Sequence, residues 1–181
     1  MKVFINPGHD PRFDSGAVNP ISGLRECDVA LSIGEILRDF LIENNHQVYL
    51  LQSDNLIGEN SALPCVVETA NAWKADVFIS LHCNAANQKA HGTETLVYKY
   101  GSSAEQLARL IQENIVSELG TKDRGIKERP RLIVLNSTLM PAVLIELAFI
   151  DQEDDERLLI NCQDKFAQAI YQGVSQYLFK C

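Results

Sequence analysis

The sequence predicts a single α/β domain over residues 1–181, with a six-stranded, mostly parallel but mixed sheet and helices on both of its faces. Short runs rich in branched and aromatic residues alternate along the chain with segments whose apolar residues recur every three or four positions. Several short runs are apolar almost throughout, which is typical of strands covered on both faces. With 181 residues, 46% of them hydrophobic, the chain can bury one core.

Six segments have the composition of strands. They are Lys2–Asn6, Gln47–Leu51, Asp76–Leu81, Glu94–Lys99, Arg131–Leu135 and Ala142–Leu147. Just before the fifth of them, residues 121–131 (TKDRGIKERPR) carry five basic and two acidic residues. We expect this basic segment to be either a solvated loop or a loop that faces substrate.

Four segments have the periodicity of helices. We expect helices over Asp28–Glu43, after Ser61, from Ser102 or Ser103 to Leu119, and over Gln163–Phe179. In the second helix, Pro64 is tolerated in the first turn, where backbone N–H groups have no partner within the helix. The third helix is marked most clearly, because a serine can cap its start and Gly120 suits a left-handed end.

Composition excludes several classes of protein. A net charge of −8 argues against nucleic-acid binding, which normally needs a basic face. No apolar run reaches the roughly 18 to 20 residues of a membrane span, and no signal peptide is visible at MKVFINPGHD. Five scattered cysteines favour free thiols over a disulfide scaffold. We therefore expect a monomer that is cytoplasmic as synthesised.

Three residues capable of metal or proton chemistry lie at or just beyond the ends of predicted strands. His9 follows the first strand through Pro7 and Gly8, His82 closes the third strand, and Glu146 lies near the end of the last. The carboxyl ends of parallel strands share one edge of a sheet, so these residues are expected to meet there. Glu26, just before the first long helix, can reach the same edge.

Two imidazoles and one carboxylate form a ligand set typical of catalytic zinc, with a fourth position left for water. We therefore predict that His9, Glu26 and His82 bind Zn²⁺ and that Glu146 is the base that activates water. Taken alone, His9 is equally a turn histidine, and Glu26 an ordinary carboxylate at a helix start. For Glu146 the structural alternative is a buried ion pair with an arginine such as Arg124.

Other catalytic classes are less consistent with the sequence. It contains no GxSxG elbow for a nucleophilic serine and no glycine-rich phosphate loop. Cys83 adjoins His82, but neighbours on a strand point to opposite faces, so we expect Cys83 to be a buried apolar thiol.

Ordered motifs along nearly the whole chain resemble one known family. They are INPGHD, DSGA, GLRE, ETANAWKADVFISLHCNA, HGTET, RGIK and MPAVLIELAFI. The sequence is similar to zinc-dependent N-acetylmuramoyl-L-alanine amidases of the amidase 3 type, found in bacterial cell-wall amidases and phage endolysins. It departs from the usual family pattern at Asn6, where an aspartate is common, and at Asp151, where an asparagine is common.

The resemblance implies His9, Glu26 and His82 as zinc ligands and Glu146 as the catalytic carboxylate. It also implies peptidoglycan as substrate, cut at the amide between the lactyl group of N-acetylmuramic acid and L-alanine.

Three further residues are expected to bind substrate. Asn84 belongs to the SLHCNA motif, while Arg124 and Lys127 are suited to the carboxylates of the stem peptide.

Two alternatives remain open at this stage. One is a zinc peptidase or carboxypeptidase that acts on the stem peptide, and the other is a peptidoglycan-binding module without turnover. The biological setting is equally open, since a phage-type lysin and a cytoplasmic wall-recycling enzyme both fit the sequence.

Overall fold

A computed structural model, which describes residues 1–178, contains one six-stranded sheet in the order β2-β1-β3-β6-β4-β5. The strands are β1 (Lys2–Pro7), β2 (Gln47–Leu50), β3 (Val77–Asn84), β4 (Thr93–Val97), β5 (Asp123–Glu128) and β6 (Ala142–Phe149). The first four strands of that order run parallel, whereas β4 is antiparallel to β6 and parallel to β5. The predicted mixed α/β fold is therefore confirmed.

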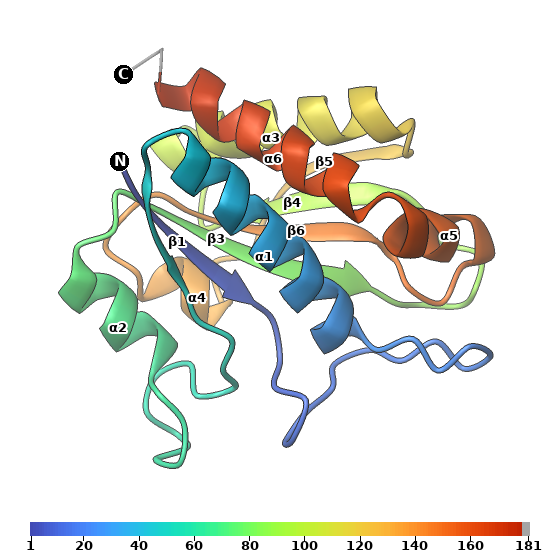
Figure 1. Ribbon diagram of the computed structural model, residues 1–181, viewed down its shortest axis with the longest axis horizontal. Coiled ribbons are helices and arrows are strands. Elements are labelled where there is room, and N and C mark those ends of the chain that lie inside the picture. Colours follow the sequence, from blue (N-terminus) through green and yellow to red (C-terminus); the bar gives the residue numbers. More distant parts are fainter. Residues whose placement is uncertain (179–181) are drawn as a thin grey trace.

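Helices cover both faces of this sheet (Figure 1). They are α1 (Glu26–Glu43), α2 (Val66–Trp73), α3 (Ser103–Leu119), α4 (Ile133–Asn136), α5 (Glu153–Asn161) and α6 (Gln163–Leu178). Helices α1, α3 and α6 bury the larger apolar cluster on one face, and α2 and α4 pack over a smaller cluster on the other. The described chain thus forms three layers, as the continuous apolar strands predict.

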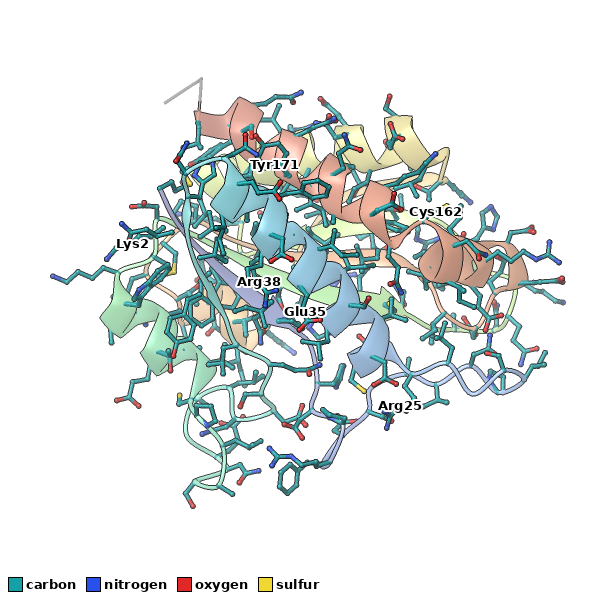
Figure 2. All side chains as sticks on the ribbon, viewed as in Figure 1. Lys2, Arg25, Glu35, Arg38, Cys162 and Tyr171 are labelled. Atoms are coloured by element: carbon teal, nitrogen blue, oxygen red, sulfur yellow. The ribbon has the colours of Figure 1, made fainter. Side chains whose placement is uncertain are left out.

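Helices α1 and α6 lie side by side across the larger face, where Phe40 stacks on Tyr171 with ring centroids 6.2 Å apart. Figure 2 shows Glu35 and Arg38 on α1, on this same side of the molecule. Because α1 packs firmly on the sheet, its first residue, Glu26, is held at the edge where β1 and β3 end.

One predicted strand is wrong. Residues 131–135 form a turn and the start of the one-turn helix α4, whose Val134 and Leu135 cover the smaller apolar cluster. Periodicity cannot separate so short an apolar run from a strand. The sixth strand is instead β5, inside the basic segment that was expected to be a loop. Its DRGIKE sequence is charged because β5 lies at the edge of the sheet, where charged side chains are common.

The helix ends follow the sequence signals closely. Ser102 accepts a hydrogen bond from the backbone N–H of Glu105 at the start of α3, and Gly120 ends that helix at φ 66°. Pro64 differs from prediction, because it precedes α2 and does not lie in its first turn. The last helix was expected to reach Phe179, which is outside the described residues.

Within residues 1–178, none of the helices combines the length and apolar character that a membrane span requires. Four of the five cysteines lie in this part of the chain, and each has a free thiol. Cys83 is buried in the larger apolar cluster, where burial raises the pKa of its thiol well above the usual value.

Candidate metal centre and cleft

The chemically reactive side chains meet at the edge where the parallel strands end. His82 on β3 lies in register with Glu146 on β6. The turn after β1 is held to β3 by a hydrogen bond from the Gly8 N–H to the Leu81 carbonyl, and this places His9 beside His82. Helix α1 supplies Glu26 from its first residue. Residues far apart in sequence are thus brought together as predicted.

His9, Glu26 and His82 form a compact donor set, with their ligand atoms within 4.8 Å of one another. One oxygen of Glu26, Oε1, lies 3.3 Å from Nε2 of His9 and 2.9 Å from Nδ1 of His82. Donor atoms around a tetrahedral zinc ion with bonds of about 2.0 Å are about 3.3 Å apart. Two imidazole nitrogens and a carboxylate at these separations fit a divalent ion such as zinc.

Two glycines make room for this arrangement. A Cβ atom on Gly8 would lie 2.3 Å from the His82 ring, and one on Gly16 would lie 2.5 Å from both the Glu26 carboxylate and the His9 ring. His9 itself has φ 65°, a left-handed conformation that is uncommon for a residue with a side chain. Such backbone strain is typical of functional sites, where the surroundings hold the residue in place.

The Glu26 carboxylate is fixed on both of its oxygens. Oε2 accepts a hydrogen bond from the Ala17 N–H at 2.8 Å, and Oε1 accepts one from the Cys83 N–H at 3.0 Å. Burial acts to raise the pKa of Glu26, but the hydrogen bonds with His82 and His9 outweigh it and lower that pKa strongly. Glu26 is therefore ionised over the whole physiological range, as a metal ligand must be.

The second ring nitrogen of His9 points away from Glu26. Its Nδ1 lies 3.1 Å from Asp14 and 4.0 Å from Asp54. A carboxylate on one imidazole nitrogen fixes the ring and leaves the other nitrogen free for a metal. Burial lowers the pKa of His9, but hydrogen bonds and the charges of Glu26 and Asp14 raise it overall, to about 9.

Glu146 lies next to this donor set, in register with His82, and forms no ion pair with a cation in the described part of the chain. Its Oε2 is buried and, among residues 1–178, has no hydrogen-bond partner. Burial raises the pKa of Glu146 to about 7, because the opposing effect of His82 is smaller than the combined effect of burial and the Glu26 and Glu94 charges. The predicted alternative, an ion pair with Arg124, is not what the structure shows. A carboxyl group that titrates near neutrality suits a general base.

Arg124 and Lys127 pair with Glu94, a residue that the sequence analysis did not single out. Glu94 is buried and lies in register with Glu146 on the neighbouring strand. Its Oε2 accepts hydrogen bonds from Arg124 Nε at 2.8 Å and from the Lys127 ammonium. Burial would raise the pKa of Glu94, but these two cations lower it. Asn84 Nδ2 contacts the other oxygen, Oε1, at 3.4 Å.

The roles predicted for Asn84, Arg124 and Lys127 in substrate binding therefore stay predictions. In this structure all three side chains contact Glu94, so substrate would have to compete for them or share them.

The donor set opens into a cleft of about 340 Å³ on the α4 side of the sheet. His9 and His82 line one end together with Asp14 and Asp54. The far wall is apolar, and its residues come from β6 and the segment around the start of α4. They are Leu132, Ile133, Val134 and Leu144. An extended, largely uncharged chain can therefore lie along this wall with one bond close to the metal ligands.

The departure from the family pattern at Asn6 has a structural reason. Asn6 is buried, and its Nδ2 donates to the carbonyl of Leu51 at 3.0 Å while its Oδ1 accepts from Ser80 Oγ at 3.1 Å. An aspartate would place a second oxygen against the Leu51 carbonyl. At the other departure, Oδ2 of Asp151 accepts hydrogen bonds from the N–H groups of Ala86 and Gln88, as an asparagine oxygen also can.

Comparison with known proteins identifies a family and several relatives of this chain. The sequence model of the family described as N-acetylmuramoyl-L-alanine amidase (Amidase_3) matches residues 3–176. The uncharacterized protein YqiI of Bacillus subtilis is 37% identical over 179 residues, which cover 97% of this chain and 84% of YqiI. The amidase LytC of the same species is 35% identical over 181 residues, covering 97% of this chain and 35% of LytC.

The fold has a counterpart among solved structures. An N-acetylmuramoyl-L-alanine amidase from Clostridium difficile 630 superposes with a TM-score of 0.85 at 33% identity, covering 98% of this chain and 96% of that one. The shared region thus spans nearly all of that solved chain, but only about a third of the length of LytC.

Proposed function

Because the chain belongs to the Amidase_3 family of N-acetylmuramoyl-L-alanine amidases, we propose that it is a zinc-dependent hydrolase of peptidoglycan. The bond cut is the amide between the lactyl group of N-acetylmuramic acid and L-alanine. The observation that carries the proposal is the convergence of His9, Glu26 and His82 beside Glu146, whose buried Oε2 has no hydrogen-bond partner within residues 1–178.

His9, Glu26 and His82 would hold the ion, since their donor atoms fit its coordination. When bound, a divalent zinc ion supplies a Lewis acid that polarises a carbonyl and acidifies water. Glu26 contributes the one negative charge of this ligand set, and the Ala17 and Cys83 N–H groups keep its carboxylate oriented. Asp14 keeps the His9 ring turned so that Nε2 faces Glu26 and would be available to an ion.

Glu146 moves the proton. Its carboxylate takes one proton of the attacking water and delivers it to the nitrogen of the leaving L-alanine, so that the C–N bond breaks and the amine departs uncharged. The apolar setting that raises the pKa of Glu146 makes both transfers accessible near neutral pH. The apolar cleft wall would hold the peptide beside His82, the neighbour of Glu146 across the strand pair.

The proposal is tested by product analysis on purified cell walls. Zinc-loaded wild-type protein is expected to release peptides whose new amino terminus is L-alanine, and a chelator is expected to abolish this until zinc is restored. Replacement of the base in Glu146→Gln should lower kcat at least about 100-fold while the fold persists. Glu68→Gln, an exposed change on α2, is the matched control.

Each alternative reading gives a different product. New amino termini within the stem peptide would indicate a peptidase, and wall binding with no release in the presence of zinc would indicate a binding module. Near-normal release by Glu146→Gln would contradict the role assigned to this carboxylate.

A further inference from the structure

A second, smaller hollow adjoins the cleft at its apolar end. It has a volume of about 240 Å³ and is lined by Arg129, Pro130, Arg131 and Leu132. Leu132 also lines the cleft that contains His9 and His82, so the two cavities share a wall residue. A chain lying in the cleft can therefore continue past Leu132 into the hollow.

The two arginines of this hollow are exceptional among the arginines of the chain. Eight arginines occur in the sequence, all within residues 1–178. Six of them pair with a carboxylate, namely Arg12, Arg25, Arg38, Arg109, Arg124 and Arg157. Arg129 and Arg131 are exposed, and neither has an ion-pair partner among the described residues. Arg129 does donate one hydrogen bond, from Nη1 to the Glu128 carbonyl at 2.9 Å. In a chain of net charge −8, two guanidinium groups that line one hollow and have no paired carboxylate within residues 1–178 suit an anion.

The other cations near the cleft are less available. Arg124 and Lys127 both contact the buried carboxylate of Glu94, which satisfies one anion with two cations. The metal end of the cleft is acidic, with Asp14 and Asp54 beside His9. The cleft is therefore polarised, with carboxylates at the ligand end and, beyond its apolar wall, two arginines that have no ion-pair partner among the described residues.

The separation of the two ends can be counted from the strand register. Glu94 is opposite Glu146 and Val97 is opposite Val143, and the Arg129 N–H bonds to the Val97 carbonyl. With about 3.4 Å per residue along a strand and about 4.8 Å between strands, the backbones of Arg129 and Glu146 lie roughly 15 Å apart. An extended peptide advances about 3.3 Å per residue, so with the reach of a guanidinium group roughly three residues cover this distance.

We infer that Arg129 and Arg131 form a subsite for carboxylates of the stem peptide, roughly three residues from the scissile amide. The inference rests on the proposed function, which places the amide beside Glu146. A guanidinium offers a planar pair of donors that matches a carboxylate, so the subsite selects stem peptides with free carboxylates over amidated ones. It binds substrate and takes no part in the proton transfers.

The subsite is tested with two soluble muramoyl-peptides that differ only in whether the stem-peptide carboxylates are free or amidated. Equilibrium affinities are measured by calorimetry on zinc-loaded Glu146→Gln, so that the result does not depend on turnover. Adding Arg129→Gln and Arg131→Gln together should weaken binding of the free carboxylate ligand about tenfold and change binding of the amidated ligand far less. Lysine at both positions should restore part of the loss.

Kinetics on the catalytically intact protein supply the second readout. The double glutamine change should raise KM for the free carboxylate substrate and leave the amidated substrate as the better of the two. Arg38→Gln, on the side of α1 that Figure 2 shows, is the matched control because that helix covers the opposite face of the sheet.

Two results would overturn the subsite. One is equal loss of affinity for both ligands, or no loss for either. The other is weakened binding to whole cell walls with unchanged affinity for the soluble ligands, which would assign the arginines to anionic wall polymers. Because the affinities are measured without turnover, failure of the amidase proposal would appear separately, as the absence of L-alanine termini with intact protein.

Discussion

Glu146 is the residue whose environment is most clearly shaped for chemistry at the expense of stability. A carboxylate with a buried, partnerless oxygen is costly in a folded protein, and the nearest charged neighbours include two other carboxylates. Its pKa of about 7 lies above the value of about 4.3 expected in an unfolded chain. Between these two values the folded protein binds more protons than the unfolded chain.

The free energy of unfolding of the wild type, measured with a chelator present, is therefore expected to fall as pH rises from about 4.5 to above 7. Below this range the contribution of the protonated group is complete, and above it the contribution is lost. Glu146→Gln removes the contribution of this group to the pH dependence, while that of His9 remains. The variant should be more stable than wild type at pH 8, by on the order of 2 kcal/mol, with a much smaller gain at pH 5. Urea unfolding at the two pH values measures this.

The exposed change Glu68→Gln serves again as control, and should not alter the difference between the two pH values. A Glu146→Gln protein that is less stable than wild type at pH 8 would show that the carboxylate has a stabilising partner after all.

At the residue scale the sequence was informative because polar side chains interrupt apolar strands. His82 and Glu146 each interrupt an apolar strand in its carboxyl-terminal half, and the structure places the two residues in register with one another. Glu94 is likewise a polar residue in an apolar strand, but it lies at the amino end of that strand. The sequence analysis missed it because it considered only the carboxyl ends of strands as places for a site. Since β4 runs antiparallel to β6, its amino end reaches the reactive edge, and strand direction cannot be read from composition.

At the element scale, buried strands and long helices were predictable, and the short elements were not. The strand β5 has few apolar residues because it lies at an edge of the sheet. Its charged side chains either pair with Glu94 or contact solvent. Residues 132–135 are apolar because Leu132, Val134 and Leu135 pack over the smaller apolar cluster of the sheet. The assignment of β5 as a strand and that of residues 131–135 as turn and helix both depend on tertiary packing, which cannot be predicted from local composition.

Helix α5 shows how one acidic side chain can fix several elements. Asp155 is buried, and its Oδ2 accepts hydrogen bonds from the N–H groups of Gly92 and Phe149, each at 2.8 Å. It therefore ties α5 to the start of β4 and the end of β6. Gly92 has φ 104° and no space for a Cβ atom beside Lys122, so this junction is closely packed.

Asp155→Ala should lower the free energy of unfolding by about 3 kcal/mol, because two buried N–H groups lose their acceptor. The neighbouring Asp154→Ala is the control, since that side chain is exposed and pairs only with Arg157. Thermal unfolding of both variants measures the effect. Equal melting temperatures for the two would mean that Asp155 does not hold the junction.

At the scale of the whole molecule, the donor set links the first helix, the turn after β1 and the centre of the sheet. An ion that binds only the folded state stabilises it by about 2.7 kcal/mol at 100 times its dissociation constant. For a chain of this size that corresponds to a rise in melting temperature of roughly 5 to 10 °C. We expect zinc to produce such a rise in wild type and little or none in His82→Ala.

The same experiment should depend on pH. The pKa of His9, raised to about 9 by Glu26 and Asp14, means that a proton must leave this ring before it can bind a metal. Zinc affinity is therefore expected to increase between pH 6 and pH 9, as titration calorimetry can measure. An affinity that is constant across this range would contradict the placement of His9 in the donor set.

The antiparallel strand β4 separates two parts of the sheet that have different proposed roles. The candidate metal ligands and the base belong to the turn after β1 and to β3, β6 and α1, whereas residues 85–132 contribute Glu94 with its cations and the arginine hollow. Sequence changes within residues 85–132 can thus alter which form of the stem peptide is preferred. The candidate metal ligands and Glu146 lie outside this segment and would stay the same. A chimaera in which residues 85–132 are exchanged between relatives would therefore carry over the substrate preference and keep the same reaction.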